Sequence, residues 1–575
     1  MFRKYLSCTV LLAAFSIQVF ASGIQVLNTS VTTNDDKKSA QVKFSLTWDH
    51  SWRLADGPKN WDAAWVFVKY RTLPGDNWSH AYIKADGSTV PSNASFKIGS
   101  SIAGVGGVNT TVGVGAFIFR KEPGNGTVAF PDIELRWDFP QNGLTGGEQV
   151  EVCVLATEMV YIPQGQYFLG DMASDRRFRR NQSNAGGRFG EEFVTVSAAA
   201  PSWLNYFSNA VNIRGSVNGT YDGIRNNLRN NSISSQVVTP APVAANAPDD
   251  VNPSNRLENN TNYTGDWVAR FAAAINGNFP RGFNAFYCMK YEITQGEYIQ
   301  FLNKNLVAVK NAGTYHHSAD AVGRYGIKKR DGTGTANVPA EYDLANPSAA
   351  FLPCNYLGTK DIMAWLVWAG LRPMSEFEFE KICRGPEAVP TDPAYRPQYA
   401  WGTTNISPAA GFSNKGGPNE APSNASGNSA VSSTSGATIG SGTNTELDGP
   451  IRAGGFATPV SSREKAGATY YGVMEMSGNL WERCVSAGIN EGRMFQGALV
   501  NGHGNGEIGP GVNPSVPMNG AARLWPAPTG TGLGFRGGSY LDPAARARIS
   551  DRMYINLGNT GRHQSFGGRG VRSDL

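Results

Sequence analysis

The sequence predicts an α+β protein that is rich in loops and begins with an all-β sandwich. The first observation is composition: 68 Gly, 32 Pro and 62 aromatic residues (13 Trp, 21 Tyr, 28 Phe) in 575 residues indicate many turns around aromatic clusters. The second is a series of short alternating apolar and polar runs near the N-terminus. The third is length, which allows more than one hydrophobic core or one domain with large insertions.

The first 21 residues are predicted to be a secretory signal peptide. Arg3 and Lys4 precede an apolar run, and the run ends in small residues before Ser22, where the mature chain is expected to begin. Cys8 invites a lipoprotein interpretation, but Tyr5 stands where a lipobox has Leu, so lipidation is the less favoured alternative. No later stretch has the roughly 18 apolar residues of a membrane span. We therefore expect an exported protein without a transmembrane segment, located at the cell surface, outside the cell or in the periplasm.

Residues 22–157 are predicted to form the β-sandwich domain. Their alternation and their Gly, Pro, Asn and Asp breaks are typical of short antiparallel strands. This region holds no cluster of carboxylates, His or Cys, which favours an interaction or spacer module over a catalytic one. The predicted boundary lies at Ala156 to Met159, so the linker to the next domain is short. The predicted strands are 23–31, 39–48, 63–72, 113–122, 132–139 and 148–157.

Two long inserts, 172–282 and 405–445, are predicted to be loops because they are rich in Asn, Ser, Gly, Pro and Thr and lack apolar periodicity. They are either binding surfaces or solvated decoration, and the sequence favours neither. The basic run Arg176 to Arg180 is interpreted as a solvated loop. The net charge of +5 is small for this length, and no nucleic-acid motif is present. We expect no nucleic-acid partner.

Three helices are predicted in the C-terminal part. They span Thr294 to Leu306, Thr359 to Ala369, and a stretch that begins after Ser375. Ser375 and Glu378 form a capping-box pattern, in which each side chain bonds the other residue's backbone N–H. Glu376, Glu378 and Glu380 resemble an acid/base cluster, but a spacing of two spreads carboxylates around a helix. A structural role is therefore favoured for all three.

Six motifs follow in order along residues 158–575, and together they are similar to one known family. In this order they resemble the formylglycine-generating-enzyme, or sulfatase-modifying-factor, family. The resemblance implies a C-type-lectin-like domain over 158–575, interrupted by the two inserts. The motifs are MVYIPQGQYFLGD (159–171), FNAFYCMKYEITQGEYIQFLN (283–303), GLRPMSEFEFEKICRG (370–385), YGVMEMSGNLWE (471–482), GFRGGSY (534–540) and GGRGVR (567–572).

The resemblance also implies where a catalytic cysteine pair would lie. Oxygen-dependent members of the family carry two thiolates, five residues apart, shortly after the RGGS-aromatic motif, and Cu(I) requires such soft ligands. Here Asp542 and Ala547 stand at those positions, and no Cys follows Cys484. We therefore expect no copper and no oxidase activity. Nearby charges predict an ion-paired or anion-binding cluster: Asp542, Arg546, Arg548, Asp551 and Arg552.

The family also carries structural calcium, one ion being close to the segment matched here by Gly478 to Glu482. Asn479, the Leu480 carbonyl and Glu482 offer the hard oxygens that Ca²⁺ prefers. The alternative is that Asn479 makes a local turn bond and Glu482 an ion pair. A structural calcium ion with these three ligands is therefore a candidate cofactor.

Five cysteines remain after removal of the signal peptide, which leaves at least one thiol unpaired. A Cys288–Cys383 disulfide and buried free thiols are both open. The histidines do not have the spacing of zinc ligands; they are His316, His317, His503 and His563. The glycine-rich run 502–511 is interpreted as a surface loop. The five are Cys153, Cys288, Cys354, Cys383 and Cys484.

These observations predict a non-enzymatic, exported structural or interaction protein of the bacterial envelope or extracellular surface. It would assemble with copies of itself or bind partner proteins through a degenerate sulfatase-modifying-factor domain. Two alternatives stay open. One is a carbohydrate-binding, lectin-like protein, and the other is a formylglycine-generating oxidase that acts on a cysteine of a partner protein.

Overall fold

The computed structural model describes residues 18–19, 23–105, 108–165 and 279–574, the last range with gaps, the most extensive of which lies between 508 and 532. Of residues 166–278 it describes only short strands, including β11 (Tyr167–Leu169), β12 (Arg180–Ser183), β13 (Phe189–Glu192) and β14 (Val194–Val196). Most of the predicted signal peptide, most of the first insert and all of the basic run except Arg180 therefore lie outside the described residues; of the signal peptide only the strand β1 (Gln18–Val19) is described. Within the described residues, no helix combines the length and apolar character that a membrane crossing requires.

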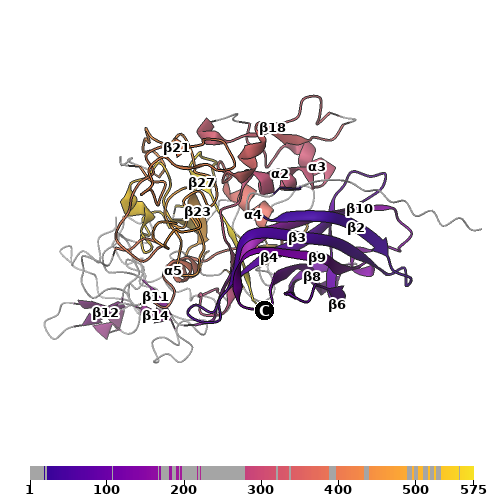
Figure 1. Ribbon diagram of the computed structural model, residues 1–575, viewed down its shortest axis with the longest axis horizontal. Helices are drawn as coiled ribbons and strands as arrows, with labels where there is room; N and C mark the ends of the chain where they lie inside the picture. The colour runs from indigo at the N-terminus through magenta and orange to yellow at the C-terminus, as the bar shows by residue number, and fades with distance from the viewer. Residues whose placement is uncertain are drawn as a thin grey trace, which may run out of the picture.

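The N-terminal region forms one large antiparallel sheet, which confirms the predicted all-β character (Figure 1). Its strands are joined in one hydrogen-bonded order, β2-β3-β9-β6-β8-β4-β10, with β5 and β7 attached to β4 and β8, rather than as two separate sheets. The bounds are β2 Gln25–Thr33, β3 Ser39–Arg53, β4 Asp62–Thr72, β5 Ser79–Ala81, β6 Ile83–Thr89, β7 Ala94–Val105, β8 Val108–Arg120, β9 Gly124–Asp138 and β10 Val150–Ile162.

The same sheet continues into the C-terminal region. β10 pairs with β4 along one edge and, at Met159 to Ile162, with β17 (Phe286–Met289). β17 then pairs with β28 (Gly570–Ser573), and β28 pairs with β20 (Arg372–Pro373). The boundary expected at Ala156 to Met159 thus lies inside a strand that serves both regions.

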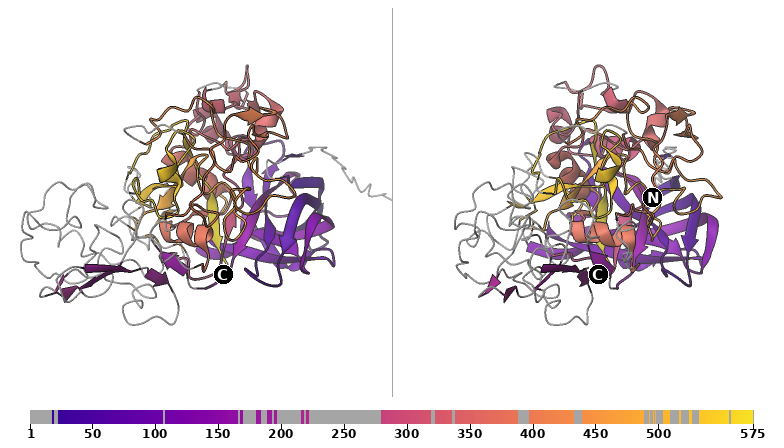
Figure 2. Two further views of the ribbon diagram at one scale, coloured as in Figure 1. Left: turned by 60° about the vertical axis from the view of Figure 1, so that its left-hand side comes forward. Right: turned by 90° about the vertical axis from the view of Figure 1, so that its left-hand side faces the viewer.

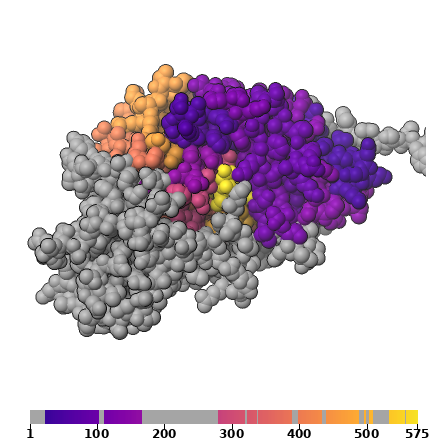
Figure 3. Space-filling view, turned by 90° about the horizontal axis from the view of Figure 1, so that it is seen from below, coloured from indigo at the N-terminus to yellow at the C-terminus, as the bar shows by residue number. Residues whose placement is uncertain are grey.

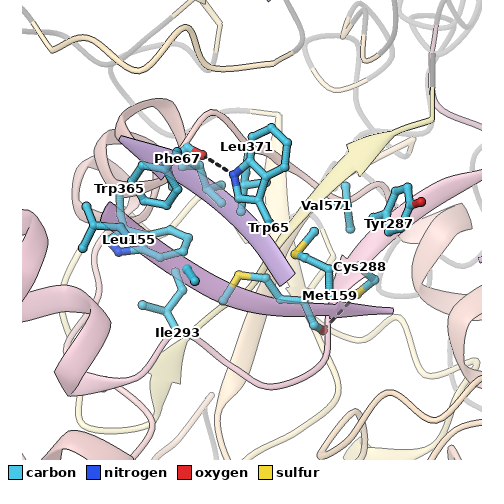
Figure 4. Packing of buried hydrophobic residues seen from close by; sticks show 14 of the residues in the cluster. Trp65, Phe67, Leu155, Met159, Tyr287, Cys288, Ile293, Trp365, Leu371 and Val571 are labelled. Atoms are coloured by element: carbon cyan, nitrogen blue, oxygen red, sulfur yellow. Dashed lines mark hydrogen bonds between the residues drawn. The ribbon is translucent and has the colours of Figure 1, made fainter. Parts of the chain in front are cut away.

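Side chains from both regions share one hydrophobic core around β10 (Figure 4). Trp65 and Phe67 of β4 are buried there, and the Trp65 indole N–H donates to the Ala369 carbonyl at 2.8 Å. Burial of such large aromatic side chains removes much apolar surface from water, so the two regions stabilise each other. Other members of this core are Leu155, Met159, Tyr287, Cys288, Ile293, Trp365, Leu371 and Val571.

The three predicted helices are present, with ends set by local capping. α2 (Gln295–Asn303) begins after Thr294, and α5 (Glu376–Arg384) begins after Ser375; both have the reciprocal capping box. α4 (Thr359–Trp368) follows Gly358. A short fourth helix, α3, covers Val307–Ala312.

The rest of the C-terminal region is mostly turns and short strands, as its glycine content predicts (Figure 2). A three-stranded sheet has β23 (Trp481–Val485) at its centre, antiparallel to β26 (Leu533–Arg536) and parallel to β27 (Phe566–Gly567). Two-stranded pairs are β18 (Ile327–Lys329) with β19 (Tyr342–Leu344), β21 (Phe412–Ser413) with β22 (Ala421–Pro422), and β24 (Val516–Pro517) with β25 (Leu524–Trp525).

The five described cysteines are buried and none of them forms a disulfide, so the candidate Cys288–Cys383 disulfide is absent. Cys288 belongs to the shared core, and burial raises the pKa of its thiol well above the ordinary range. The open alternative, buried free thiols that pack as small apolar side chains, is the one that the structure has.

Candidate functional site

The two positions where the resemblance places a cysteine pair follow β26: Asp542 lies in a turn, and Ala547 ends the short 3-10 helix Ala544–Ala547. Arg536 ends this strand, and Gly537 and Gly538 then adopt positive φ angles of 91° and 76°. A Cβ atom on Gly538 would lie 3.0 Å from the Ala547 backbone nitrogen, so this close approach requires glycine. The turn aims Ser539 and Asp542 inward, and Ala547 is fully buried.

The Asp542 carboxylate accepts three hydrogen bonds from three segments. Oδ2 accepts from the Trp481 indole N–H at 2.6 Å and from the Ser539 hydroxyl, and Oδ1 accepts from the Gly440 N–H at 3.1 Å. Burial raises the pKa of Asp542 above its ordinary value, and these bonds oppose the rise. The two family motifs around Trp481 and Ser539 therefore meet at this carboxylate.

The end of the second insert lies against the same site. Besides Gly440, the Asn444 amide donates to the Tyr540 carbonyl at 2.7 Å, and the Ser432 N–H donates to the Asp542 carbonyl at 2.8 Å. Ile439 packs on the cluster of Trp481, Phe535 and Phe566. The end of the insert is thus attached to the turn that carries Asp542. Whether the insert is a binding surface or solvated decoration stays a prediction.

The structure divides the predicted charged cluster among different partners. Arg546 and Asp551 form an ion pair at 2.9 Å, as expected. Arg552 instead pairs with Glu376 at 2.5 Å, and Arg548 lies beside Tyr399. Asp542 forms no ion pair with an arginine among the described residues. The five residues are close in sequence, but the turn directs their side chains to separate neighbours.

The three carboxylates of α5 are structural, as the sequence predicted. Glu376 accepts from Arg552, Glu378 accepts from Arg372 at 2.7 and 2.8 Å, and Glu380 accepts from Arg536 at 2.7 Å. Arg384 also contacts Glu380, at 3.2 Å. All these side chains are buried. The spacing of two sends each carboxylate to a different arginine, which is why they do not form an acid/base cluster.

The residues named for calcium are engaged with protein groups. The Asn479 Oδ1 accepts from the Ile451 N–H at 2.9 Å, and its amide donates to Glu292 at 2.7 Å. Glu482 accepts from Arg569 through both oxygens, at 2.6 to 2.9 Å. The described residues hold no group of three or more His, Cys, Asp or Glu side chains that suits a metal. In this arrangement Asn479 and Glu482 do not fit a calcium site.

Sequence reasoning missed several buried charged residues. Glu292 accepts from both Asn479 and the Leu480 N–H, the latter at 2.9 Å, and Glu158 pairs with Lys290 at 2.7 Å. Glu475 has a strained positive φ of 56°, and its Oε2 is buried without a hydrogen-bond partner in the described chain. The available signal was a charged residue inside an otherwise apolar motif, which indicates a buried partner but does not name it.

The four histidines considered in the sequence analysis all contact other protein groups. His316 contacts the Ile327 carbonyl at 3.1 Å, and His317 lies against the Tyr356 ring, 4.2 Å between centroids. His563 Nδ1 lies 2.7 Å from the Ser565 hydroxyl, and His503 Nε2 accepts from the Ser573 N–H at 2.9 Å. Buried Ser565 is enclosed by Gly440, on which a Cβ would lie 2.3 Å from its hydroxyl oxygen.

The chain was compared with models of protein families and with curated proteins. The family described as the sulfatase-modifying factor enzyme 1-like domain matches residues 277–573, which is more than half of the chain. No curated protein matches. The match covers α2, α4, α5 and the whole site around Asp542. The chain therefore belongs to the family of proteins with a sulfatase-modifying factor enzyme 1-like domain.

Proposed function

We propose that this chain is a non-enzymatic, exported protein of the bacterial envelope or extracellular surface. In this proposal its sulfatase-modifying-factor domain serves as a scaffold for self-assembly or for binding partner proteins. The observation that carries the proposal is the state of Asp542. It stands where the resemblance implies a thiolate, and its carboxylate is already taken by Trp481, Ser539 and Gly440.

Chemistry supports this conclusion. Cu(I) is held by soft sulfur ligands, whereas Asp542 offers hard oxygens and Ala547 only a methyl group. Neither side chain forms a mixed disulfide with a substrate cysteine. All five cysteines of the mature chain are buried elsewhere in the fold, and burial keeps the pKa of Cys484 and Cys383 high, so they stay thiols.

The edge strand β2 supports self-association. On its outer side the only strand that pairs with it, among the described residues, is β1 (Gln18–Val19), which belongs to the predicted signal peptide. The strand carries no charged residue from Gln25 to Thr33, and Ser30, Thr32 and Thr33 are exposed. β10 also lies beside β2, so the exposed, uncharged residues from Ser30 to Thr33 are the part of the edge that favours pairing with another chain.

The catalytic part is tested by incubating purified residues 22–575 with a cysteine-containing peptide, copper and oxygen. Mass spectrometry of the peptide follows the conversion of the thiol to an aldehyde. We expect no conversion above that of the peptide and copper alone. Turnover that needs the protein and is lost in Asp542→Ala would overturn the non-enzymatic proposal.

The assembly part is tested by light scattering and electron microscopy of the same protein. We expect particles larger than a monomer, and we expect the double variant Ser30→Lys/Thr32→Lys to shift them toward monomer by placing charge on the β2 edge. The double variant Asn125→Lys/Ala129→Lys is the matched control, because it adds the same two charges at exposed positions of β9 that are already paired with Trp52 and Thr47. A monomer at high concentration would refute self-assembly.

A further inference from the structure

A small hollow lies where the N-terminal sheet meets the C-terminal strand β28. Figure 3 shows the C-terminal residues, in yellow, set in a recess beside the N-terminal sheet. The hollow is lined by β7, β8, β28 and the segment that contains His503. Its polar lining comes from Lys97, Ser100, His503, Arg572 and Asp574, and Phe117 supplies an apolar wall.

The strand registers explain why these groups meet. Lys97 is opposite Phe117 in the β7–β8 pair, and Arg572 is opposite Tyr287 in the β17–β28 pair. The Phe117 and Tyr287 rings stack with centroids 3.7 Å apart, which joins the two pairs face to face. The two cations Lys97 and Arg572, which are far apart in the sequence, therefore both line the hollow.

Arg572 is buried and has no carboxylate partner among the described residues. Its guanidinium donates to the Gly370 carbonyl, to the Ser100 carbonyl at 2.5 Å and to the Ser101 hydroxyl at 3.3 Å, and lies 4.8 Å from the Trp65 ring centroid. Burial, and then the neighbouring Arg372 charge, lower the pKa of Arg572 to about 9, so the group stays charged at neutral pH. A buried charge without a counter-ion is costly.

The charges around the hollow do not balance. Arg372 is neutralised by Glu378, and Lys97 by Asp574 at 2.5 Å. Among the described residues, three cations therefore face two carboxylates, and the positive charge without a described counter-ion is that of Arg572. His503 adds no charge, because burial lowers its pKa well below the usual value. Its Nε2 accepts from the Ser573 N–H, so Nδ1 carries the ring proton and is a donor.

We propose that this hollow binds a small oxyanion, a carboxylate, sulfate or phosphate group, between Lys97 and Arg572. Such a group would supply the counter-charge that Arg572 lacks and accept charge-assisted hydrogen bonds. In the free protein the hollow has room for about one water molecule, and Asp574 holds Lys97. Binding therefore requires the Asp574 side chain, which competes with the ligand for Lys97, to move aside. The proposal does not depend on whether the chain is an enzyme.

The proposal predicts opposite effects of two conservative substitutions. Lys97→Gln removes one cation and should weaken binding about tenfold, the order expected for one charge-assisted hydrogen bond. Asp574→Asn removes the internal competitor and should tighten binding by a similar factor. A purely structural Lys97–Asp574 ion pair would instead make both variants equally less stable, with no gain in affinity.

The experiment measures the melting temperature of residues 22–575 against increasing sodium sulfate, phosphate and acetate, with ionic strength held constant by sodium chloride. Isothermal calorimetry on the same samples gives the affinities. Lys84→Gln is the control, because Lys84 of β6 forms a similar ion pair with Asp138 of β9, and neither residue lines the hollow. Preference for sulfate and phosphate over acetate would identify a tetrahedral oxyanion as the ligand class, and the reverse a carboxylate.

Two results would overturn the proposal. One is the absence of saturable stabilisation by all three anions. The other is an affinity that Asp574→Asn lowers or leaves unchanged. Both substituted side chains are partly exposed, at 41% and 19%, so both variants are expected to fold, and circular dichroism checks this.

Discussion

Replacing Glu482 by Gln should strongly destabilise the protein through a charge effect and not through loss of a metal. Glu482 and Arg569 are 1% and 0% exposed at the side chain, and three donor–acceptor pairs of 2.6 to 2.9 Å join them. Burial alone would lower the pKa of Arg569, and the Glu482 charge is the main influence that raises it again. The Gln side chain keeps the shape but leaves the buried guanidinium without its counter-ion.

Breaking a buried pair on one side costs about 3–5 kcal/mol. Arg569 keeps its hydrogen bonds to the carbonyls of Met289, Lys290 and Met474, so the lower part of this range is expected. A loss of about 3 kcal/mol is a large part of the roughly 5–15 kcal/mol that stabilises a folded domain. Urea unfolding followed by tryptophan fluorescence measures it.

The matched control is Asp343→Asn, since Arg330 and Asp343 form a similar two-point pair that is about half exposed. Exposed pairs contribute at most about 1 kcal/mol, so this variant should be nearly neutral. EDTA should leave the unfolding curve of the unmodified protein unchanged. A Glu482→Gln variant as stable as the control, or a clear loss of stability with EDTA that calcium reverses, would refute the reasoning.

Three further outcomes follow from the site. Burial raises the pKa of Glu475 from 4.5 to about 7, so its contribution to stability is complete below pH 4.5 and is lost as the pH rises through 7. Glu475→Gln should therefore gain up to roughly 3 kcal/mol at pH 8 and little at pH 4.5 in urea unfolding, and equal effects at both would contradict this. Asp542→Ala leaves three donors without an acceptor and should cost about 3 kcal/mol, with faster amide hydrogen exchange at Gly440 than in Asp542→Asn. Residues 158–575 alone should be insoluble or poorly protected from exchange, because the core around β10 is lost, whereas a soluble, folded fragment would show that the two regions are independent.

The sequence alone predicted the structure wherever residues close together in the chain determine it. The α2 and α5 helices begin at Thr294 and Ser375 because each capping box closes within four residues. In the N-terminal sheet, Ala40, Val42, Phe44, Leu46 and Trp48 alternate with less buried positions along β3, which is the period-two pattern that predicts a half-buried strand.

Contacts between distant residues were outside the reach of one sequence. β17 is the only partner of β10 on the C-terminal side in the described chain, and four paired positions specify it, too few to leave a pattern. The approach of Gly440 to Asp542 joins residues 102 apart through one backbone N–H, which every non-proline residue has. Residue type carried no signal of this contact, so the insert was predicted only as a loop.

The family motifs retain a purpose in this chain even without the thiols. Arg536 of the RGGSY motif pairs with Glu380 of the third motif, Glu482 pairs with Arg569, and Trp481 bonds Asp542. Each of the last four motifs thus supplies one half of a buried polar contact, and the loss of either half leaves a charge or donor unsatisfied at a cost of several kcal/mol. These motifs therefore have a structural role, whether or not the domain catalyses a reaction. A match to this family therefore identifies the domain, whereas an activity has to be argued from individual side chains, here those at positions 542 and 547.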